Sequence, residues 1–248
     1  MSSIDGFWPH NISPNRLAIL ERKLVIWLRS QGLLVSVDTN PDVQLLTQQA
    51  ATEGYDLSEL QALIQSIVSA PTDSFIELAG IANLNVRQDF SGAKMLGVQL
   101  TNLDLSGVNF QQSYLRGADL SDADLSAANL KSANLSGADL SGTLLSDADL
   151  SGANLHRVSL ALANLSGATL IKANLENANL NNCNLSNANL SGSRLVNADL
   201  SQAGLALTNL QQVDFTGTNV QQARLWHDAG LSETVKQDLI QRGAVFED

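Results

Sequence analysis

Every fifth residue of this chain is apolar over more than half of its length. The register begins at Phe90 and ends at Leu225, and all 28 positions divisible by five in this span carry an apolar side chain. The residue two places earlier is small, most often Ala, and Asp or Asn usually stands between the two. A register this long indicates an internal repeat, which has to be identified before any local element is assigned.

A period of five fits neither a helix nor a flat strand. A straight α-helix would rotate successive leucines by about 140° and spread them around its circumference. A right-angle turn in each repeat instead directs every Leu and Ala to one axis. Four turns close a coil of 20 residues, so the repeats predict about seven coils in a rod about 34 Å long. The predicted core includes Phe90, Leu120, Leu140, Leu165, Leu190 and Phe215.

The string Ala-Asn-Leu-Ser-Gly-Ala-Asp-Leu-Ser-Gly at 133–142 carries a family resemblance. It resembles the pentapeptide repeat family, and the resemblance extends over residues 89–225. It implies a mainly β solenoid, a right-handed quadrilateral β-helix, with the handedness taken from the family. A helical segment ahead of the repeats resembles the arrangement in many cyanobacterial members.

The two ends lack the repeat and predict helices. We expect an α-helical domain at 1–80, the β-helix at 81–228 and a capping helix at 229–248. Ser13-Pro14 predicts the start of the first helix, and Asn40-Pro41 predicts a second that ends near Gly54. A third helix is expected after an Asp56/Glu59 capping box, and a fourth, short helix is expected at about 73–79. The expected inward residues of the first and last helices are Leu17, Leu20, Leu24, Trp27 and Leu28, and Val235, Leu239 and Ile240.

The residue types that carry chemistry do not form a recognisable motif. His10, His156 and His227 lie far apart and lack metal-ligand spacing. Cys183 occupies the small inward position and is expected to fill the core. The chain has neither a nucleophile elbow nor a phosphate-binding glycine loop. We therefore expect a protein that is not an enzyme, with no catalytic, metal or cofactor site.

Charge and hydropathy limit the partners and the compartment. The formal net charge is −11, which argues against direct nucleic-acid binding because that needs clustered Lys and Arg. No apolar run is long enough to span a membrane, and a secretory signal pattern is not evident. We expect a cytoplasmic protein.

Grouping the repeats four to a coil places most solenoid basic residues on one wall. The same wall holds most departures from the repeat consensus, while its neighbour, with Asp119, Asp122, Asp139 and Asp199, has no basic residue. The alternative explanation is drift on a tolerant outer surface. The candidate partner surface consists of Tyr114, Arg116, His156, Arg157 and Arg194.

These observations favour a protein interaction or scaffolding role with an unknown protein partner. Whether the terminal helices only cap the rod or also bind a partner stays open, as does the choice between a monomer and a dimer through a helical end. The alternative function is mimicry of B-form DNA to inhibit or protect DNA gyrase, a role known in the family. Residues 89–225 hold 11 acidic and 7 basic residues, a net of −4, whereas a duplex of about 34 Å carries about 20 charges.

Overall fold

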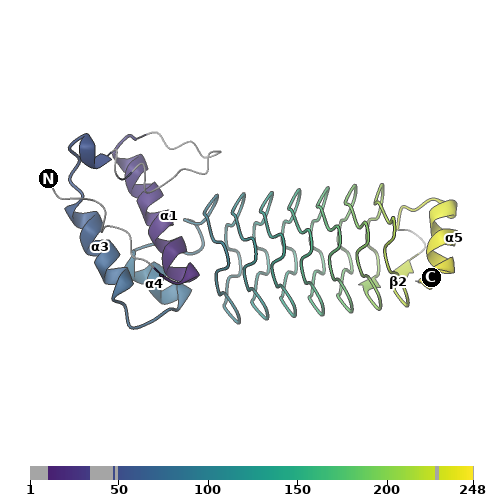
Figure 1. Ribbon diagram of the computed structural model, residues 1–248. Helices are drawn as coiled ribbons and strands as arrows, with labels where there is room; N and C mark the ends of the chain where they lie inside the picture. Colours follow the sequence, from purple (N-terminus) through teal and green to yellow (C-terminus); the bar gives the residue numbers. More distant parts are fainter. Residues whose placement is uncertain (1–10, 34–46, 48–49, 227–228, 248) are drawn as a thin grey trace.

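The computed structural model shows a helical N-terminal part, a long rod of coils and a small C-terminal cap (Figure 1). It describes residues 11–33, 47, 50–226 and 229–247. The N-terminal part contains α1 (Pro14–Ser30), α3 (Ser58–Val68) and α4 (Phe75–Ile81). The rod includes β1 (Gly204–Leu205) and β2 (Arg224–Trp226), and the cap contains α5 (Glu233–Gln241) and β3 (Val245–Glu247).

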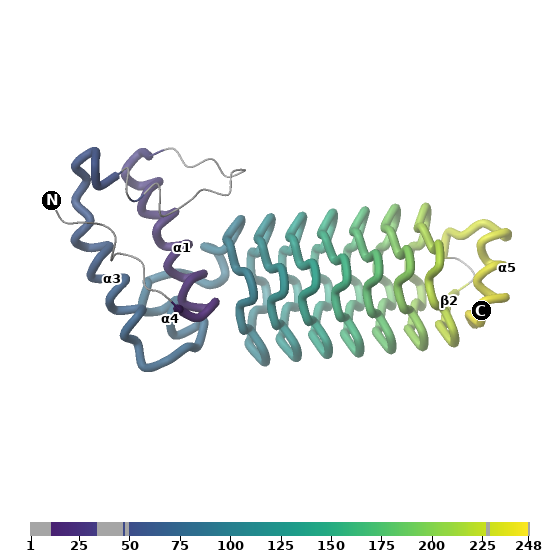
Figure 2. The backbone as a smooth tube through the Cα atoms, in the orientation of Figure 1, coloured from purple at the N-terminus to yellow at the C-terminus, as the bar shows by residue number. Residues whose placement is uncertain are grey.

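Each coil of the rod takes 20 residues, as the repeat predicted. Parallel β-bridges join each residue before the central apolar one to its equivalent 20 positions later, as in Tyr114 to Asn134. The Leu115 N–H donates to the Asn134 carbonyl at 2.8 Å, and the Asn134 N–H donates to the Ser113 carbonyl at 2.8 Å. The traced backbone therefore advances as evenly spaced coils along one axis (Figure 2).

The corners explain why Asp or Asn precedes each Leu and why Gly or Asn follows two places later. The Asp119 carboxylate accepts a hydrogen bond from the Ser121 N–H at 3.1 Å, which closes a turn around Leu120. The next residue, Asp122, has φ of 56°, and Gly142 in the same place one coil later has φ of 68°. Gly and Asn adopt this left-handed conformation most readily.

The core runs as a continuous apolar column along the rod. The predicted interior residues are buried, from Phe90 at 0% exposure to Phe215 at 6%. At the N-terminal end the Phe75 and Phe90 rings lie 5.0 Å apart, and the Phe90 and Phe110 rings 6.4 Å apart. Phe75 belongs to α4, so this stack joins the helical core to the first two coils.

The helices begin and end close to where the sequence predicts, with one difference at the start of α3. The Ser13 side chain caps α1, with Pro14 as the first helical residue, as predicted. Asp56 does not cap α3, because the helix starts at Ser58 with Leu57 as its N-cap, and the Asp56 carboxylate accepts the Ser58 N–H instead. The helix predicted from Asn40-Pro41 begins outside the described residues, and its end at Thr52 precedes Gly54.

The predicted inward stripes of the terminal helices are partly wrong. In α1, Leu20, Leu24 and Leu28 are buried, but Leu17 is 38% exposed. Instead of packing into the helical core, Leu17 lines a small groove between α1 and the rod. In α5, Leu239 is buried while Ile240 is 42% exposed, because the short helix covers the last coil with a narrow stripe.

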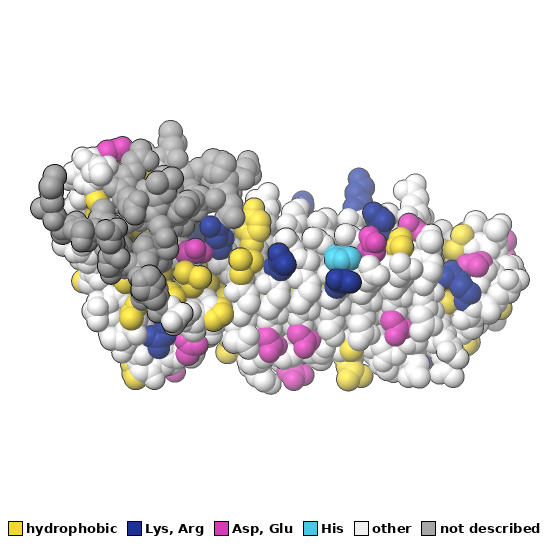
Figure 3. Space-filling model, viewed as in Figure 1, with side chains coloured by type: hydrophobic (Ala, Val, Ile, Leu, Met, Phe, Trp, Pro, Cys, Tyr) yellow, Lys and Arg dark blue, Asp and Glu magenta, His cyan; other side chains and the backbone are white. Residues whose placement is uncertain are grey.

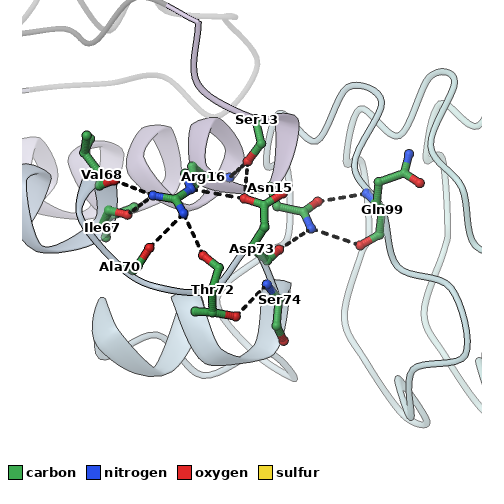
Figure 4. Close-up of polar contacts among 10 residues, drawn as sticks. All are labelled: Ser13, Asn15, Arg16, Ile67, Val68, Ala70, Thr72, Asp73, Ser74 and Gln99. Carbon is green, nitrogen blue, oxygen red and sulfur yellow. Dashed lines mark hydrogen bonds and ion pairs between the residues drawn. The ribbon is translucent and has the colours of Figure 1, made fainter.

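A single side chain continues the β-ladder into the helical part (Figure 4). The Asn15 amide oxygen accepts the Gln99 N–H at 2.8 Å, and its nitrogen donates to the Gln99 carbonyl at 3.2 Å and to the Asp73 carbonyl at 2.9 Å. One coil further on, the backbone of Asp119 makes bonds of the same two kinds. Its N–H donates to the Val98 carbonyl, and its carbonyl accepts the Leu100 N–H. The buried Asn15 amide thus takes the place of a peptide group from a preceding coil.

Arg16 fastens α1 to the end of α3 and the segment that follows (Figure 4). Its guanidinium pairs with the Asp73 carboxylate at 3.1 Å. Its remaining donors reach four backbone carbonyls, those of Ile67, Val68, Ala70 and Thr72. Ile67 and Val68 are the last residues of α3 and the other two belong to the segment after it, so one guanidinium holds the helix end and the segment together.

The C-terminal cap closes the rod by two means. β3 pairs in parallel with β2, which pairs with β1, so the ladder gains one more strand. The Arg242 guanidinium donates to the Phe215 and Thr218 carbonyls, both at 3.0 Å. α5 thereby lies over the last coil, where its side chains shield an apolar end that would otherwise favour aggregation.

Candidate functional site

The predicted partner surface lies on one wall of the rod, here called the basic wall. We define it as residues 94–97 and their equivalents at 20-residue steps up to 214–217. Bridges join its consecutive coils from Lys94 to Tyr114 and onward to Arg194 and Asp214. Tyr114, Arg116, His156, Arg157 and Arg194 therefore belong to one face, although they are spread over 81 residues of sequence.

The N-terminal half of the basic wall is cationic. Tyr114 is 36% exposed, Arg116 and Arg157 are exposed, and His156 is half-buried. Residues 94–97, 114–117, 134–137 and 154–157 include no acidic residue. Figure 3 shows basic side chains and the histidine along the middle of the rod, a group of acidic side chains below them, and further acidic side chains among the basic ones toward the C-terminal cap.

The C-terminal half of the basic wall is electrostatically mixed. Arg194 lies 3.5 Å from the Glu176 carboxylate one coil earlier, so the candidate surface loses one of its free cations. An exposed pair of this kind contributes at most about 1 kcal/mol to stability. Hydrogen bonds from the Thr216 hydroxyl and N–H, together with the nearby Arg194, hold the pKa of the Asp214 carboxyl below its usual range.

The neighbouring wall, at 99–102 and its 20-residue equivalents, is acidic. Asp119 and Asp139 are bridged directly, one coil apart, and Asp199 lies in the same column. This wall contains no Lys, Arg or His. It also carries Leu162, which is 70% exposed. Sequence reasoning does not identify this residue as part of a surface.

A small groove between α1 and the basic wall was also missed. It has a volume of about 180 Å³. Leu96, which stands where the repeat prefers Ser, is 56% exposed and forms part of its lining. The sequence signal for this groove is Leu96, an apolar residue at an outward position of the repeat. Helical periodicity predicts Leu17 to lie in the helical core, and therefore does not point to the groove. The lining residues are Pro14, Leu17, Ala18, Glu21, Lys94, Leu96 and Tyr114.

A second recess of about 490 Å³ lies at the other end, between the last coil and α5. Phe215 and Val235 form its apolar floor and side, and Asp214, Asp238 and Arg242 its polar rim. Arg242 is already committed to the Asp238 carboxylate and to two backbone carbonyls. Of the charged residues at this junction, Asp238 and Arg242 are therefore paired with each other, while the Asp214 carboxylate accepts hydrogen bonds from Thr216.

Groups suited to catalysis are scattered or inert. Within the ranges that the structure describes, no three His, Cys, Asp or Glu side chains are grouped closely enough to hold a metal ion. Burial raises the pKa of the Cys183 thiol to about 12. His156 lies on the basic wall, while His10 and His227 fall outside the described residues. None of the described helices is long and apolar enough to cross a membrane.

Comparison with solved structures finds matches that include other pentapeptide repeat proteins. A pentapeptide repeat protein from the Arabidopsis thaliana thylakoid lumen is 27% identical, with a TM-score of 0.31, over 58% of this chain and 81% of the other. HetL, a pentapeptide repeat protein involved in heterocyst differentiation regulation, from the cyanobacterium Nostoc, is 27% identical, with a TM-score of 0.21. The match covers 52% of this chain and 86% of HetL. QnrB1, a plasmid-mediated fluoroquinolone resistance protein, is 21% identical over 63% and 90%, with a TM-score of 0.39.

Comparison at the sequence level identifies the family. No protein of curated function matches the chain significantly. The profile of pentapeptide repeats matches in 8 copies, over residues 89–122, 123–161, 163–202 and 193–225. These matches cover more than half of the chain and coincide with the coils described above. The chain belongs to the pentapeptide repeat family.

Proposed function

We propose that this protein is a non-enzymatic interaction protein that uses the N-terminal half of its basic wall to bind a protein partner. The observation that carries the proposal is a pair of exposed cations, Arg116 and Arg157, on a stretch of wall without acidic residues. In the described part of the chain, neither guanidinium has an ion-pair or hydrogen-bond partner, whereas Arg194 does.

The rod suits this role because its backbone is already fixed. The β-bridges between residues i and i+20 hold the wall positions in register, so a partner meets a surface that loses little conformational entropy on binding. Tyr114 and the arginines are of the residue types that supply most binding energy at interfaces. In this proposal residues 81–228 present the surface, and 1–80 and 229–248 protect its ends.

Gyrase protection by DNA mimicry is the second candidate. The acidic wall favours it, since Asp119 and Asp139 repeat at one-coil steps. Charge density counts against it, because the net of −4 over 89–225 is far below the roughly 20 charges of an equally long duplex. A supercoiling assay with purified gyrase decides the matter. Protection or inhibition at micromolar protein would support mimicry, and its absence would remove it.

The main proposal is tested by affinity capture with two matched double variants. Arg116→Glu with Arg157→Glu reverses both unpaired cations. Lys131→Glu with Lys172→Glu makes the same charge change at the equivalent repeat positions of another wall. We expect the first variant to lose a partner captured by the native chain, and the second to retain it. Melting curves of all three proteins check that the rod is intact.

The captured partner is then identified by mass spectrometry and its binding repeated with purified components. Equal loss in both double variants would indicate a general effect of charge rather than a site on the basic wall. Unchanged capture by the first variant would exclude this wall as the binding surface.

A further inference from the structure

We infer that the groove between α1 and the basic wall receives an apolar side chain of the partner, and that the segment bearing it is acidic. The inference rests on the proposed function and makes it more specific. It assigns half of the site to the helical part, so that α1 both caps the rod and contacts the partner.

The groove has a size and lining suited to one side chain. Its volume of about 180 Å³ is below the range of about 300–1,000 Å³ that is usual for small-molecule pockets. Leu17 comes from α1, and Leu96 and Tyr114 come from two adjacent coils. These three side chains are 38%, 56% and 36% exposed, respectively. Their clustering is unusual on a wall whose other outward residues are mostly polar or charged, and such clusters mark interaction sites.

The two sides of the groove are held in place. Asn15 in the first turn of α1 is bonded to both backbone groups of Gln99, at 2.8 and 3.2 Å. At the preceding corner of the rod, Gly97 lies beside Pro14, and a Cβ added there would be in ordinary van der Waals contact with the proline Cγ, at 4.0 Å. The groove therefore exists before a partner arrives, which lowers the entropic cost of binding.

The lining of the groove includes charges of both signs, Glu21 and Lys94, so the basic residues further along the wall are what select an acidic occupant. Moving along the rod from Leu96, the next equivalent positions are Arg116, Ser136 and His156, with Arg157 at the adjoining corner. Arg116 and Arg157 are two coils apart, which corresponds to about 10 Å along the axis. A peptide in the polyproline II conformation advances about 9 Å in three residues and returns residues i and i+3 to the same face, whereas in a β-strand they would point to opposite faces. A segment with one apolar residue and two carboxylates three residues apart would match the groove and both cations.

The mode of binding follows from the backbone of the wall. In the coils from Tyr114 to Arg194, the residue before each central Leu uses both its backbone groups in bonds to adjacent coils; the Tyr114 N–H donates to the Ala93 carbonyl, and its carbonyl accepts the Met95 N–H. A partner cannot add a strand here, as it could at an open sheet edge. It has to bind through side chains, with the apolar anchor and the ion pairs providing the specificity.

The test uses a fluorescein-labelled Gly/Ser peptide that contains one Phe, followed by two Asp residues placed three positions apart. Matched peptides replace the Phe by Ser, or both Asp residues by Asn. Fluorescence polarisation is measured with the full chain. We expect each replacement in the peptide to weaken binding at least tenfold, and added salt to weaken the binding of the Asp peptide.

The protein variants Leu17→Ser and Leu96→Ser test the two sides of the groove separately. Leu162→Ser removes an exposed leucine from the acidic wall and is the matched control. We expect each groove variant to weaken binding of the Phe peptide at least tenfold and the control to leave it unchanged. Because all three leucines are exposed, unchanged melting curves are expected. Equal binding of the Phe and Ser peptides, or an unaffected Leu17→Ser variant, would overturn the inference.

The same variants separate this inference from the proposed function. If Leu17→Ser and Leu96→Ser still capture the native partner while the Arg116/Arg157 reversal does not, the wall binds the partner and the groove plays no part. If the arginine reversal also leaves capture intact, both the proposed function and the groove assignment fail.

Discussion

The rod and the helical part are stabilised in different ways. In the rod each contact recurs every coil, so the turn around Leu120 is repeated around Leu125 and Leu140. In the helical part the decisive contacts occur once, through Asn15 and Arg16. A repeated lattice distributes the cost of any one defect among neighbours, whereas the junction depends on a few individual side chains.

This difference also separates the sources of binding specificity. The consensus Asn, Ser and Gly of the walls offer the same contacts in every coil, so on the basic wall only the departures from consensus, such as Arg116 and Arg157, can fix the position of a partner along the axis. The groove at α1 occurs once. A partner anchored there would have a defined register on an otherwise repetitive surface.

The largest effect is expected at the aromatic junction. Phe90→Ala should lower the free energy of unfolding by about 3–5 kcal/mol, since it removes the ring that contacts both Phe75 and Phe110. We also expect the helical signal in circular dichroism to melt before the rod. Phe215→Ala, near the other end, is the control and should leave the N-terminal helices coupled to the coils. A single unshifted transition for Phe90→Ala would show that the two parts are not joined through this stack.

The next largest effect is expected from Arg16→Ala. The change leaves four backbone carbonyls and the Asp73 carboxylate without their donor, which should cost about 2–3 kcal/mol in urea unfolding of the helical part. Arg29→Ala, at the exposed end of the same helix, should change stability by less than about 0.5 kcal/mol. If both variants unfold alike, the Arg16 contacts contribute little.

A smaller effect, dependent on pH, is expected from Cys183 inside the rod. Burial raises the pKa of its thiol to about 12, from a model-compound value of 9.0. The unfolded chain ionises first, so this contribution to stability is complete below about pH 9 and is lost as the pH rises toward 12. Iodoacetamide should label the thiol only after unfolding. Cys183→Ala should show a weaker loss of stability over the same pH range, and rapid labelling of the native chain would contradict the prediction.

The smallest effect should distinguish two inward serines. The Ser113 hydroxyl donates to the Phe110 carbonyl at 2.7 Å, whereas the buried Ser193 hydroxyl has no hydrogen-bond partner. Ser193→Ala should raise the free energy of unfolding by about 0.5–1 kcal/mol, and Ser113→Ala should lower it by about 1 kcal/mol. Thermal melts of the two variants measure the difference, and shifts of the same sign would refute it.

Much of the rod could be predicted because its determinants are local and repeated. The position of Leu120 toward the axis and the turn at Asp119 follow from five residues of sequence. The pairing of Arg194 with Glu176 could not be predicted in the same way, because it depends on which rotamers two long side chains adopt across adjacent coils. The exposure of Leu17 depended on where α1 docks, and helical periodicity does not specify the docking partner.

The 20-residue coil has a consequence for how such a chain can lengthen. Inserting one pentapeptide would turn everything that follows by a quarter revolution, so α5 would face a different side of the rod from the one it faces now. Four inserted pentapeptides would restore the orientation and move α5 about 4.8 Å further along the axis. The two ends therefore keep their relative orientation only when the rod is lengthened or shortened by whole coils. While that orientation is kept, the distance between them can change only in steps of one coil.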